Sequence, residues 1–184
     1  DAIRQAGLKV FVDTMYGAGA GYLKRLLAGG STKVIELNGR RNPAFPGIQP
    51  EPISKNLSKL MGRVKREKAH VGLASDGDAD RLGVVDERGE FVTQLQVYAL
   101  LALYLLEVRG ERGSLIKTIT TTSMIYRLGE LYGCPVVETD VGFKYVGPEM
   151  LRQNALIGGE ESGGYGFRGH IPERDSVLAA LYFL

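Results

Sequence analysis

Disulfides, long apolar segments and a surplus of one charge are all missing from this chain of 184 residues. A single cysteine, Cys134, excludes an internal disulfide framework and fits a reducing cytoplasm, which is the expected location. No apolar run reaches the roughly 18 residues that a membrane-spanning helix needs, so we expect no membrane partner. The 23 basic and 21 acidic side chains nearly cancel, which argues against a nucleic-acid partner.

The composition is that of a globular chain. The 25 glycines are scattered without a repeat, which excludes a collagen-like or low-complexity chain. Hydrophobic residues make up 44% and charged residues 24%, so the chain can bury a core. Its length suffices for one ordinary domain or two small ones. The chain begins at Asp1 and stops at Leu184 inside an apolar run, and we expect it to be part of a longer protein.

Apolar segments of strand length alternate with segments of helical period, which predicts an α/β fold with largely parallel or mixed sheets. The expected strands are 8–12, 33–37, 71–74, 82–86, 115–119 and 135–138, and an apolar segment at 155–157 leads into a glycine-rich loop. The expected helices are 20–27, 54–68, 94–108, 123–132 and 145–153, with a last one beginning near Arg174. Turn residues give way to a long helix near residue 92, so we predict two domains, 1–92 and 93–184.

Three carboxylates lie at alternate positions between two expected strands, in the segment Ser75-Asp-Gly-Asp-Ala-Asp-Arg81. Carboxylates this close repel one another, and each raises the pKa of its neighbours. A hard divalent cation removes that repulsion, and an all-oxygen ligand set suits Mg²⁺ rather than zinc. We therefore predict that Asp76, Asp78 and Asp80 bind Mg²⁺, with Arg81 placed to attract a phosphoryl group.

Two other interpretations of this acidic loop stay open. The loop nearly matches a calcium-binding EF-hand, with Glu87 at the twelfth position counted from Asp76. Against this, Arg81 stands where an EF-hand needs glycine, and strands rather than helices are expected on either side. A solvated acidic turn is the simpler alternative, but the apolar strands on both sides favour a metal site.

Two glycine-rich loops follow expected strands. The first, Gly17-Ala-Gly-Ala-Gly21, has the position of a dinucleotide-binding turn but the spacing GxGxG, and close strand-to-helix contact explains it better. The second, Gly158-Gly-Glu-Glu-Ser-Gly-Gly164, places two carboxylates and a hydroxyl among glycines, and such groups commonly hold vicinal sugar hydroxyls. A glycosidase pair is disfavoured, because adjacent residues seldom face each other across a substrate. A purely structural turn is the other alternative.

Four segments stand out in chain order: Asp76-Gly-Asp-Ala-Asp-Arg81, Val141-Gly-Phe-Lys-Tyr-Val-Gly147, Gly159-Glu-Glu-Ser-Gly163 and His170-Ile-Pro-Glu-Arg-Asp175. Together they resemble the α-D-phosphohexomutase family, which includes phosphoglucomutase and phosphomannomutase. The resemblance covers nearly the whole chain and implies the second and third of the family's four domains. Each would be a three-layer α/β/α domain with a mixed, mainly parallel sheet. Val141 and Ser176 depart from the pattern, which often has Thr and Gly there.

The resemblance implies a role for each segment. Asp76, Asp78 and Asp80 would hold one Mg²⁺. Glu160 and Ser162 would bind sugar hydroxyls, and Gly142 and Phe143 would set the orientation of the sugar. Lys144, His170 and Arg174 would line the substrate site, and Arg81 and Lys117 would be the catalytic cations.

The implied activity is the interconversion of hexose 1-phosphate and hexose 6-phosphate, with glucose as the preferred sugar. A phosphoserine would donate its phosphoryl group, and glucose 1,6-bisphosphate would be the intermediate. Neither the family's phosphoserine loop nor its C-terminal phosphate-binding loop is found in this sequence. We therefore expect the chain to need flanking domains of the same protein and to be inactive alone. A non-catalytic sugar-phosphate-binding or regulatory module is the alternative.

Overall fold

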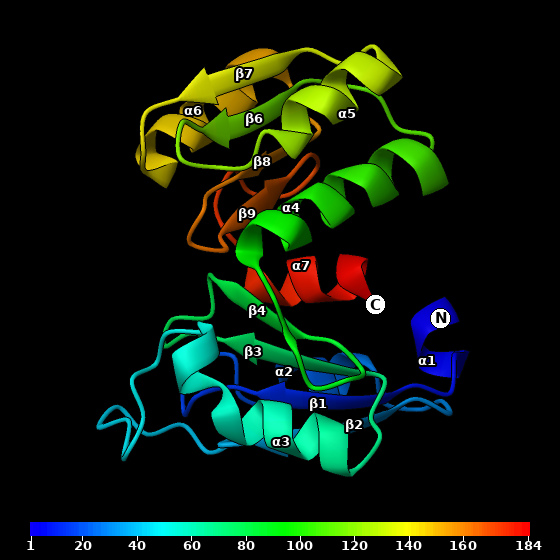
Figure 1. Cartoon of the computed structure of the whole chain (residues 1–184), viewed down its shortest axis with the longest axis vertical. Helices are drawn as coiled ribbons and strands as arrows, with labels where there is room; N and C mark the ends of the chain where they lie inside the picture. The colour runs from blue at the N-terminus through cyan, green and yellow to red at the C-terminus, as the bar shows by residue number, and fades with distance from the viewer. The chain divides into compact units, whose positions relative to one another are not determined.

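The computed structural model describes all residues from 1 to 184, and their contacts form two compact units (Figure 1). Unit 1 contains residues 1–93, 176–182 and 184, and unit 2 contains residues 94–175 and 183. The expected division near residue 92 places the last helix in the second domain. In the structure, the contacts of this helix group residues 176–182 with unit 1. None of the helices combines the length and the apolar character that crossing a membrane requires.

Unit 1 is built on a five-stranded mixed sheet in the order β2-β1-β3-β4-β5. Strands β1 (Lys9–Asp13), β2 (Lys33–Leu37) and β3 (Val71–Ser75) run parallel. Strands β4 (Leu82–Val85) and β5 (Phe91–Val92) continue the sheet in antiparallel pairing. Since β1 lies between β2 and β3, its carboxyl end is flanked by the carboxyl ends of two parallel strands.

Helix α3 covers one face of this sheet. It spans Ser58–Arg66 and follows a short 3-10 turn, η1 (Ser54–Asn56). Its apolar side chains Leu60 and Val64 are fully buried in one cluster with Phe11 of β1. Three or four residues separate successive apolar positions of the helix, so a single face meets the sheet while its charged residues face solvent.

Two more helices cover the opposite face and complete an α/β/α arrangement. They are α2 (Tyr22–Leu26) and α7 (Ser176–Phe183), and a short α1 (Ala2–Gln5) precedes the first strand. Val177 of α7 lines the same small pocket as Val12 of β1, on the side of the sheet away from Phe11. Successive strand residues point to opposite faces, which is why Phe11 and Val12 meet different helices.

Unit 2 repeats this layout around a four-stranded sheet in the order β7-β6-β8-β9. Strands β6 (Leu115–Thr118), β7 (Val136–Thr139) and β8 (Ile157–Gly159) are parallel, and β9 (Tyr165–Phe167) pairs antiparallel with β8. Over the two sheets, four of the seven strand pairings are parallel. The expected α/β class with mixed sheets is confirmed.

The helices of unit 2 are α4 (Gln94–Leu103), which continues as a π-helical turn η2 (Tyr104–Val108), α5 (Met124–Tyr132) and α6 (Phe143–Gln153). Helix α6 begins two residues earlier than expected, because Gly142 adopts a φ of 123° and starts the helix there. The apolar segment expected at 155–157 leads into β8, which begins at Ile157, whereas nothing was expected at strands β5 and β9. Both are only two or three residues long, too short for a recognisable alternating pattern.

Two successive glycines in β8 allow helices to approach both faces of the second sheet. A Cβ on Gly158 would lie 2.5 Å from Sδ of Met150 in α6, and one on Gly159 would lie 2.8 Å from the ring of Tyr98 in α4. The Tyr98 ring stacks on Tyr165 with centroids 5.6 Å apart, and both side chains are fully buried. The glycines that begin the second glycine-rich loop therefore also make room for the core.

Candidate functional site

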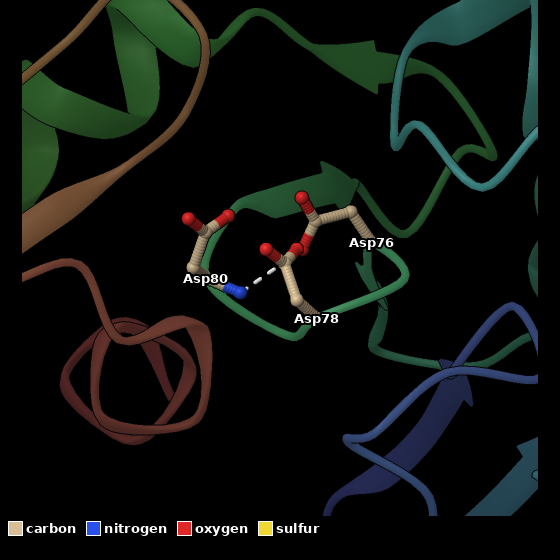
Figure 2. Close-up of side chains that lie close together, drawn as sticks. All are labelled: Asp76, Asp78 and Asp80. Atoms are coloured by element: carbon tan, nitrogen blue, oxygen red, sulfur yellow. Dashed lines mark hydrogen bonds between the residues drawn. The ribbon is translucent and has the colours of Figure 1, made fainter. Parts of the chain in front are cut away.

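The acidic loop connects β3 to β4 and gathers three carboxylates (Figure 2). Ligand oxygens of Asp76, Asp78 and Asp80 all lie within 4.8 Å of one another. Asp76 is buried, Asp80 is half-buried and Asp78 is exposed to solvent. The donor set contains only carboxylate oxygens, so it fits a hard divalent cation such as Mg²⁺.

Asp76 organises the loop around itself. Its Oδ1 accepts hydrogen bonds from the backbone N–H groups of Asp80 and Arg81, at 2.9 and 3.1 Å. Ala79 adopts a left-handed φ of 66°, which lets the chain turn back within this short connection. The three aspartates, which alternate along the chain, form a cluster because Asp76 binds the backbone of the residues that follow it.

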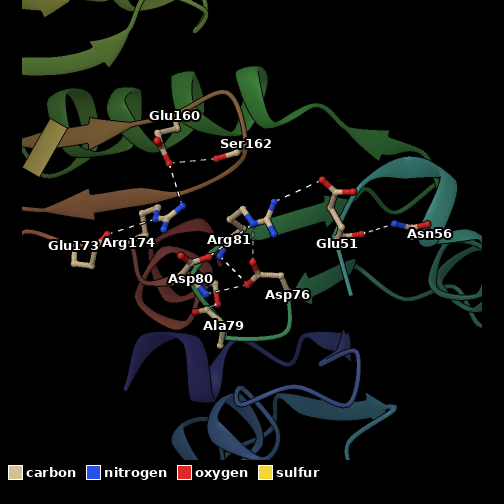
Figure 3. Close-up of polar contacts among 11 residues, drawn as sticks. Glu51, Asn56, Asp76, Ala79, Asp80, Arg81, Glu160, Ser162, Glu173 and Arg174 are labelled. Atoms are coloured by element: carbon tan, nitrogen blue, oxygen red, sulfur yellow. Dashed lines mark hydrogen bonds and ion pairs between the residues drawn. The ribbon is translucent and has the colours of Figure 1, made fainter. Parts of the chain in front are cut away.

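Arg81 supplies the positive charge next to this cluster (Figure 3). Its Nε donates to Oδ2 of Asp76 at 2.6 Å, and its guanidinium also lies 3.8 Å from Asp80 and 3.6 Å from Glu51. Burial alone would raise the pKa of Asp76, but the hydrogen bonds from Arg81 outweigh it and hold that pKa below its usual value. Asp76 is therefore ionised and able to ligate a cation.

The first glycine-rich loop lies directly against the acidic loop. A Cβ on Gly17 would come within 2.7 Å of the carbonyl oxygens of Asp76 and Gly77, and one on Gly19 would lie 2.8 Å from Oγ of Ser75. The N–H of Ala18 also donates to the carbonyl of Gly77 at 2.9 Å. These contacts explain the glycines through close backbone approach, but the approach is to the acidic loop rather than between a strand and a helix as expected, and it helps to hold that loop in place.

The second glycine-rich loop places a buried carboxylate between a hydroxyl and a cation (Figure 3). Oε2 of Glu160 accepts hydrogen bonds from Oγ of Ser162 and Nη1 of Arg174, both at 3.3 Å. Burial raises the pKa of Glu160, although Arg174 and Ser162 act in the opposite direction. A Cβ on Gly164 would collide with Cδ of Arg174, so this glycine makes room for the arginine.

The segment around Gly142 brings further expected residues to this loop. The guanidinium of Arg174 lies 5.8 Å from the ring centre of Phe143, the first residue of α6. Phe143 is buried, whereas Lys144 is exposed and its Nζ lies 5.0 Å from the ring of Tyr145. Glu160, Ser162, Arg174 and Phe143 therefore form one neighbourhood within unit 2.

Two other expected residues have partners elsewhere in unit 2. Lys117 lies in β6 with only 2% of its surface exposed, and its Nζ pairs with Oε2 of Glu138 at 2.8 Å. Tyr126 donates to the same carboxylate oxygen at 2.6 Å. His170 lies on an exposed loop, with Nε2 at 3.0 Å from Oδ2 of Asp175. None of these contacts involves Glu160 or Ser162.

Glu161 was not among the expected site residues, yet the structure holds it firmly. Its Oε2 accepts a hydrogen bond from the buried hydroxyl of Thr118 at 2.8 Å, and Thr118 also bonds Thr121 at 2.7 Å. Burial acts to raise the pKa of Glu161, but hydrogen bonds from Thr120 and Thr118 outweigh it and lower that pKa. The run of threonines after β6 was the signal in the sequence that could have identified this anchor.

Comparison with known proteins agrees with these motifs. Residues 1–89 match the family model of phosphoglucomutase/phosphomannomutase, alpha/beta/alpha domain II, and residues 94–184 match that of domain III. The chain is 37% identical over 178 residues to a phosphoglucomutase/phosphomannomutase of Thermococcus kodakarensis, covering 97% of this chain and 39% of that protein. It is 38% identical over 165 residues to a probable phosphoglucosamine mutase of Methanococcoides burtonii, covering 90% of the chain and 37% of the relative.

A solved structure supports the same assignment. The crystal structure of a putative phosphomannomutase from Thermus thermophilus superposes with a TM-score of 0.92 at 41% identity. That match covers 98% of this chain and 42% of the other. The chain therefore spans about two fifths of the relatives it matches. With family models matched along nearly its entire length, the chain belongs to the phosphoglucomutase/phosphomannomutase family and carries its α/β/α domains II and III.

Proposed function

We propose that the protein to which this chain belongs interconverts hexose 1-phosphate and hexose 6-phosphate, with glucose as its preferred sugar. The observation that carries this proposal is the cluster of three aspartates, within 4.8 Å of one another, in a chain of this family. The reaction would use a phosphoserine and glucose 1,6-bisphosphate as intermediate, as the family resemblance implies. In the whole protein, the phosphoserine and the bisphosphorylated sugar would both contact residues of this chain.

We assign one Mg²⁺ to Asp76, Asp78 and Asp80. Bound there, the ion would offset negative charge on the phosphoryl oxygens during transfer. Arg81 supports this role, because its 2.6 Å hydrogen bond orients Asp76 and keeps it ionised. Its charge also adds to the attraction for a phosphoryl group.

The assigned sugar contacts lie in unit 2. The buried carboxylate of Glu160 already accepts two hydrogen bonds, and a sugar hydroxyl is the same kind of donor. Ser162 and Phe143 lie beside it, and Gly142 gives the preceding backbone its unusual conformation. The further predicted substrate-binding residues are Lys144, His170 and Arg174, and the predicted catalytic cations are Arg81 and Lys117.

The glucose preference and the inactivity of the isolated chain are part of the proposal. Some relatives are named as phosphoglucosamine mutases, so glucosamine and mannose phosphates are the competing substrates to compare. The chain has no segment resembling the family's phosphoserine loop, and without that nucleophile no phosphoryl group can be exchanged. The alternative from another class is a module that binds sugar phosphates without catalysis.

The metal assignment can be tested on the chain itself. We expect Mn²⁺ to broaden backbone NMR signals of residues 75–81, and the substitution Asp78→Asn to weaken this effect roughly tenfold, because it removes one charged ligand. Glu87→Gln, which removes the same charge from the neighbouring exposed turn, is the matched control. Equal broadening in the wild type and Asp78→Asn would contradict the metal site.

The activity is tested with the whole protein, supplied with glucose 1-phosphate and a small amount of glucose 1,6-bisphosphate. We expect Asp78→Asn to reduce turnover about 100-fold and Glu87→Gln to leave it unchanged. The 184-residue chain alone should show none. Turnover by the chain alone would refute its proposed inactivity. No turnover by the whole protein with any hexose phosphate would favour the non-catalytic module.

A further inference from the structure

A polar pocket separate from the acidic loop lies in unit 1, at the carboxyl end of β1. It has a volume of about 210 Å³, and its polar lining residues are Asp13, Tyr16, Asn38, Asn56, Ser58 and Lys59. Residues 46–48, in the connection between β2 and η1, complete the lining. None of its lining residues belongs to the acidic loop or to the loop 158–164. At about 30 Å³ for each water molecule, roughly seven would fill the pocket. A volume of this size can hold a small metabolite.

The position in the fold is one that favours ligands. The pocket lies beyond the carboxyl ends of two adjacent parallel strands, because Asn38 directly follows β2 and β2 pairs with β1. In open α/β sheets, ligands bind outside the carboxyl ends of the strands. Asp13 is the last residue of β1 and therefore stands there.

Asp13 contributes an unsatisfied acceptor to this pocket. Its side chain is 1% exposed, and Oδ1 accepts hydrogen bonds from Met15 N at 3.0 Å and Asn38 Nδ2 at 2.9 Å. Its second oxygen, Oδ2, accepts no hydrogen bond from the chain. Because Oδ2 has no donor in the chain and is not completely enclosed, it can accept a hydrogen bond from a ligand hydroxyl in the pocket.

Other lining residues offer donors and positive charge. Helix α3 begins at Ser58 without any side-chain cap, and the N–H groups of Ser58, Lys59 and Leu60 donate no hydrogen bond. The ammonium of Lys59 has no carboxylate within ion-pair distance, although its charge acts on Asp13. Free N–H groups at a helix start, together with a lysine, suit a phosphoryl group, because it presents three acceptor oxygens.

The backbone around the pocket is held in shape before any ligand arrives. Met15, Tyr16 and Asn38 all adopt left-handed φ values, at 48°, 60° and 49°. The N–H of Tyr16 donates to the carbonyl of Asn38 at 3.0 Å, which ties the ends of β1 and β2 together. Such uncommon conformations persist where the surrounding structure demands them, as in ligand sites.

We propose that this pocket binds a small phosphate ester that carries hydroxyl groups, such as a monosaccharide phosphate. The phosphoryl group would lie at the start of α3 beside Lys59, and the hydroxyls would face Asp13 and Asn38. The pocket lies within unit 1 and shares no residue with the sugar loop of unit 2, so it would be a second, regulatory site for ligands of the same chemical class. The proposal does not depend on the mutase activity.

The test is an NMR titration of the 184-residue chain with glucose 6-phosphate, inorganic phosphate and glucose as separate probes. We expect glucose 6-phosphate to shift the backbone signals of Tyr16, Ile48 and Ser58. Lys59→Ala should weaken this binding about tenfold, since it removes one charge-assisted contact. Lys55→Ala, an exposed lysine in the neighbouring 3-10 turn that does not line the pocket, should leave it unchanged.

A second variant examines the acceptor end. Asp13→Asn keeps one oxygen that can accept the two existing hydrogen bonds, but its NH2 group cannot accept a hydrogen bond from a ligand hydroxyl. We therefore expect weaker binding of glucose 6-phosphate and unchanged binding of inorganic phosphate. Should this variant not fold, Lys59→Ala still decides the matter, because its side chain is exposed.

Several results would overturn the proposal. One is the absence of shifts around the pocket up to roughly 10 mM glucose 6-phosphate, and another is equal binding by Lys59→Ala and Lys55→Ala. Equal affinity for inorganic phosphate would refute the role of the hydroxyls, and equal affinity for glucose would refute the role of the phosphoryl group. Shifts confined to residues 158–164 would refute this site while supporting the proposed function.

Discussion

Arg81 donates a hydrogen bond from Nε to Oδ2 of Asp76 over 2.6 Å, and the aspartate side chain is completely buried. The same carboxylate accepts two backbone N–H groups through its other oxygen. A single ion pair thus neutralises a buried charge, fixes the shape of the acidic loop and orients a predicted metal ligand. Its loss should affect both stability and metal binding.

We expect Arg81→Ala to lower the free energy of unfolding by about 3 kcal/mol, because it leaves the buried carboxylate of Asp76 without its cation. Urea unfolding followed by circular dichroism at neutral pH measures this. Arg88→Ala is the matched control, since Arg88 is 72% exposed and its ion pairs should contribute less than about 0.5 kcal/mol. Equal stability of the two variants would show that the Arg81–Asp76 pair is not an important contact.

A second ion pair holds a buried lysine in unit 2. Lys117 is 2% exposed and pairs with Glu138 at 2.8 Å, so Glu138→Gln should lower the melting temperature, because it leaves a buried ammonium without its counter-charge. The hydrogen bond to Glu138 also raises the pKa of Tyr126, and this pKa should fall towards its ordinary value in the same variant. Glu130→Gln on the exposed side of α5 is the control and should change neither quantity. An unchanged Tyr126 titration would contradict the contact.

The stacked pair Tyr98 and Tyr165 should resist ionisation. Burial raises the pKa of both phenols far above the usual value, and the neighbouring ring adds to this for Tyr165. The unfolded chain releases these protons near pH 10. Below that pH the two phenols do not favour unfolding, and above it the free energy of unfolding falls, because only the unfolded chain can ionise them. Absorbance at 295 nm should show that two of the nine tyrosines ionise only on unfolding. A single reversible step for all nine, with native circular dichroism, would contradict this.

Two glycine substitutions should act in opposite directions. Gly159→Ala places a methyl group 2.8 to 2.9 Å from three atoms of the fully buried Tyr98 ring, so we expect a loss of about 2 kcal/mol. Gly62→Ala lies in α3 with nothing within 4 Å of the new Cβ, so it should add about 0.5 to 1 kcal/mol through helix propensity. Thermal unfolding of both variants measures the difference. Destabilisation by Gly62→Ala would refute the assumed open space.

Much of the chain's local structure could be predicted from its sequence. The strand expected at 33–37 has the observed bounds, and the expected helix 123–132 differs from α5 by one residue. The acidic loop was also predictable, because its three carboxylates are close in the chain and no long-range contact is needed to bring them near one another. Short elements such as β5 and β9 could not be predicted, because two or three residues show no periodicity.

Local information in the chain was therefore enough to specify the alternation of strands and helices, the acidic loop, and the glycines where the backbone must approach closely. The tertiary structure decided which distant groups meet. Glu160 contacts Arg174, which is 14 residues away in the sequence. Lys117 and Glu138 are separated by 21 residues, and Asp13 and Asn38 by 25. The physical reason is that hydrophobic periodicity specifies the face of each element, whereas side-chain partners depend on strand order and register, and these are chosen only when the elements pack together.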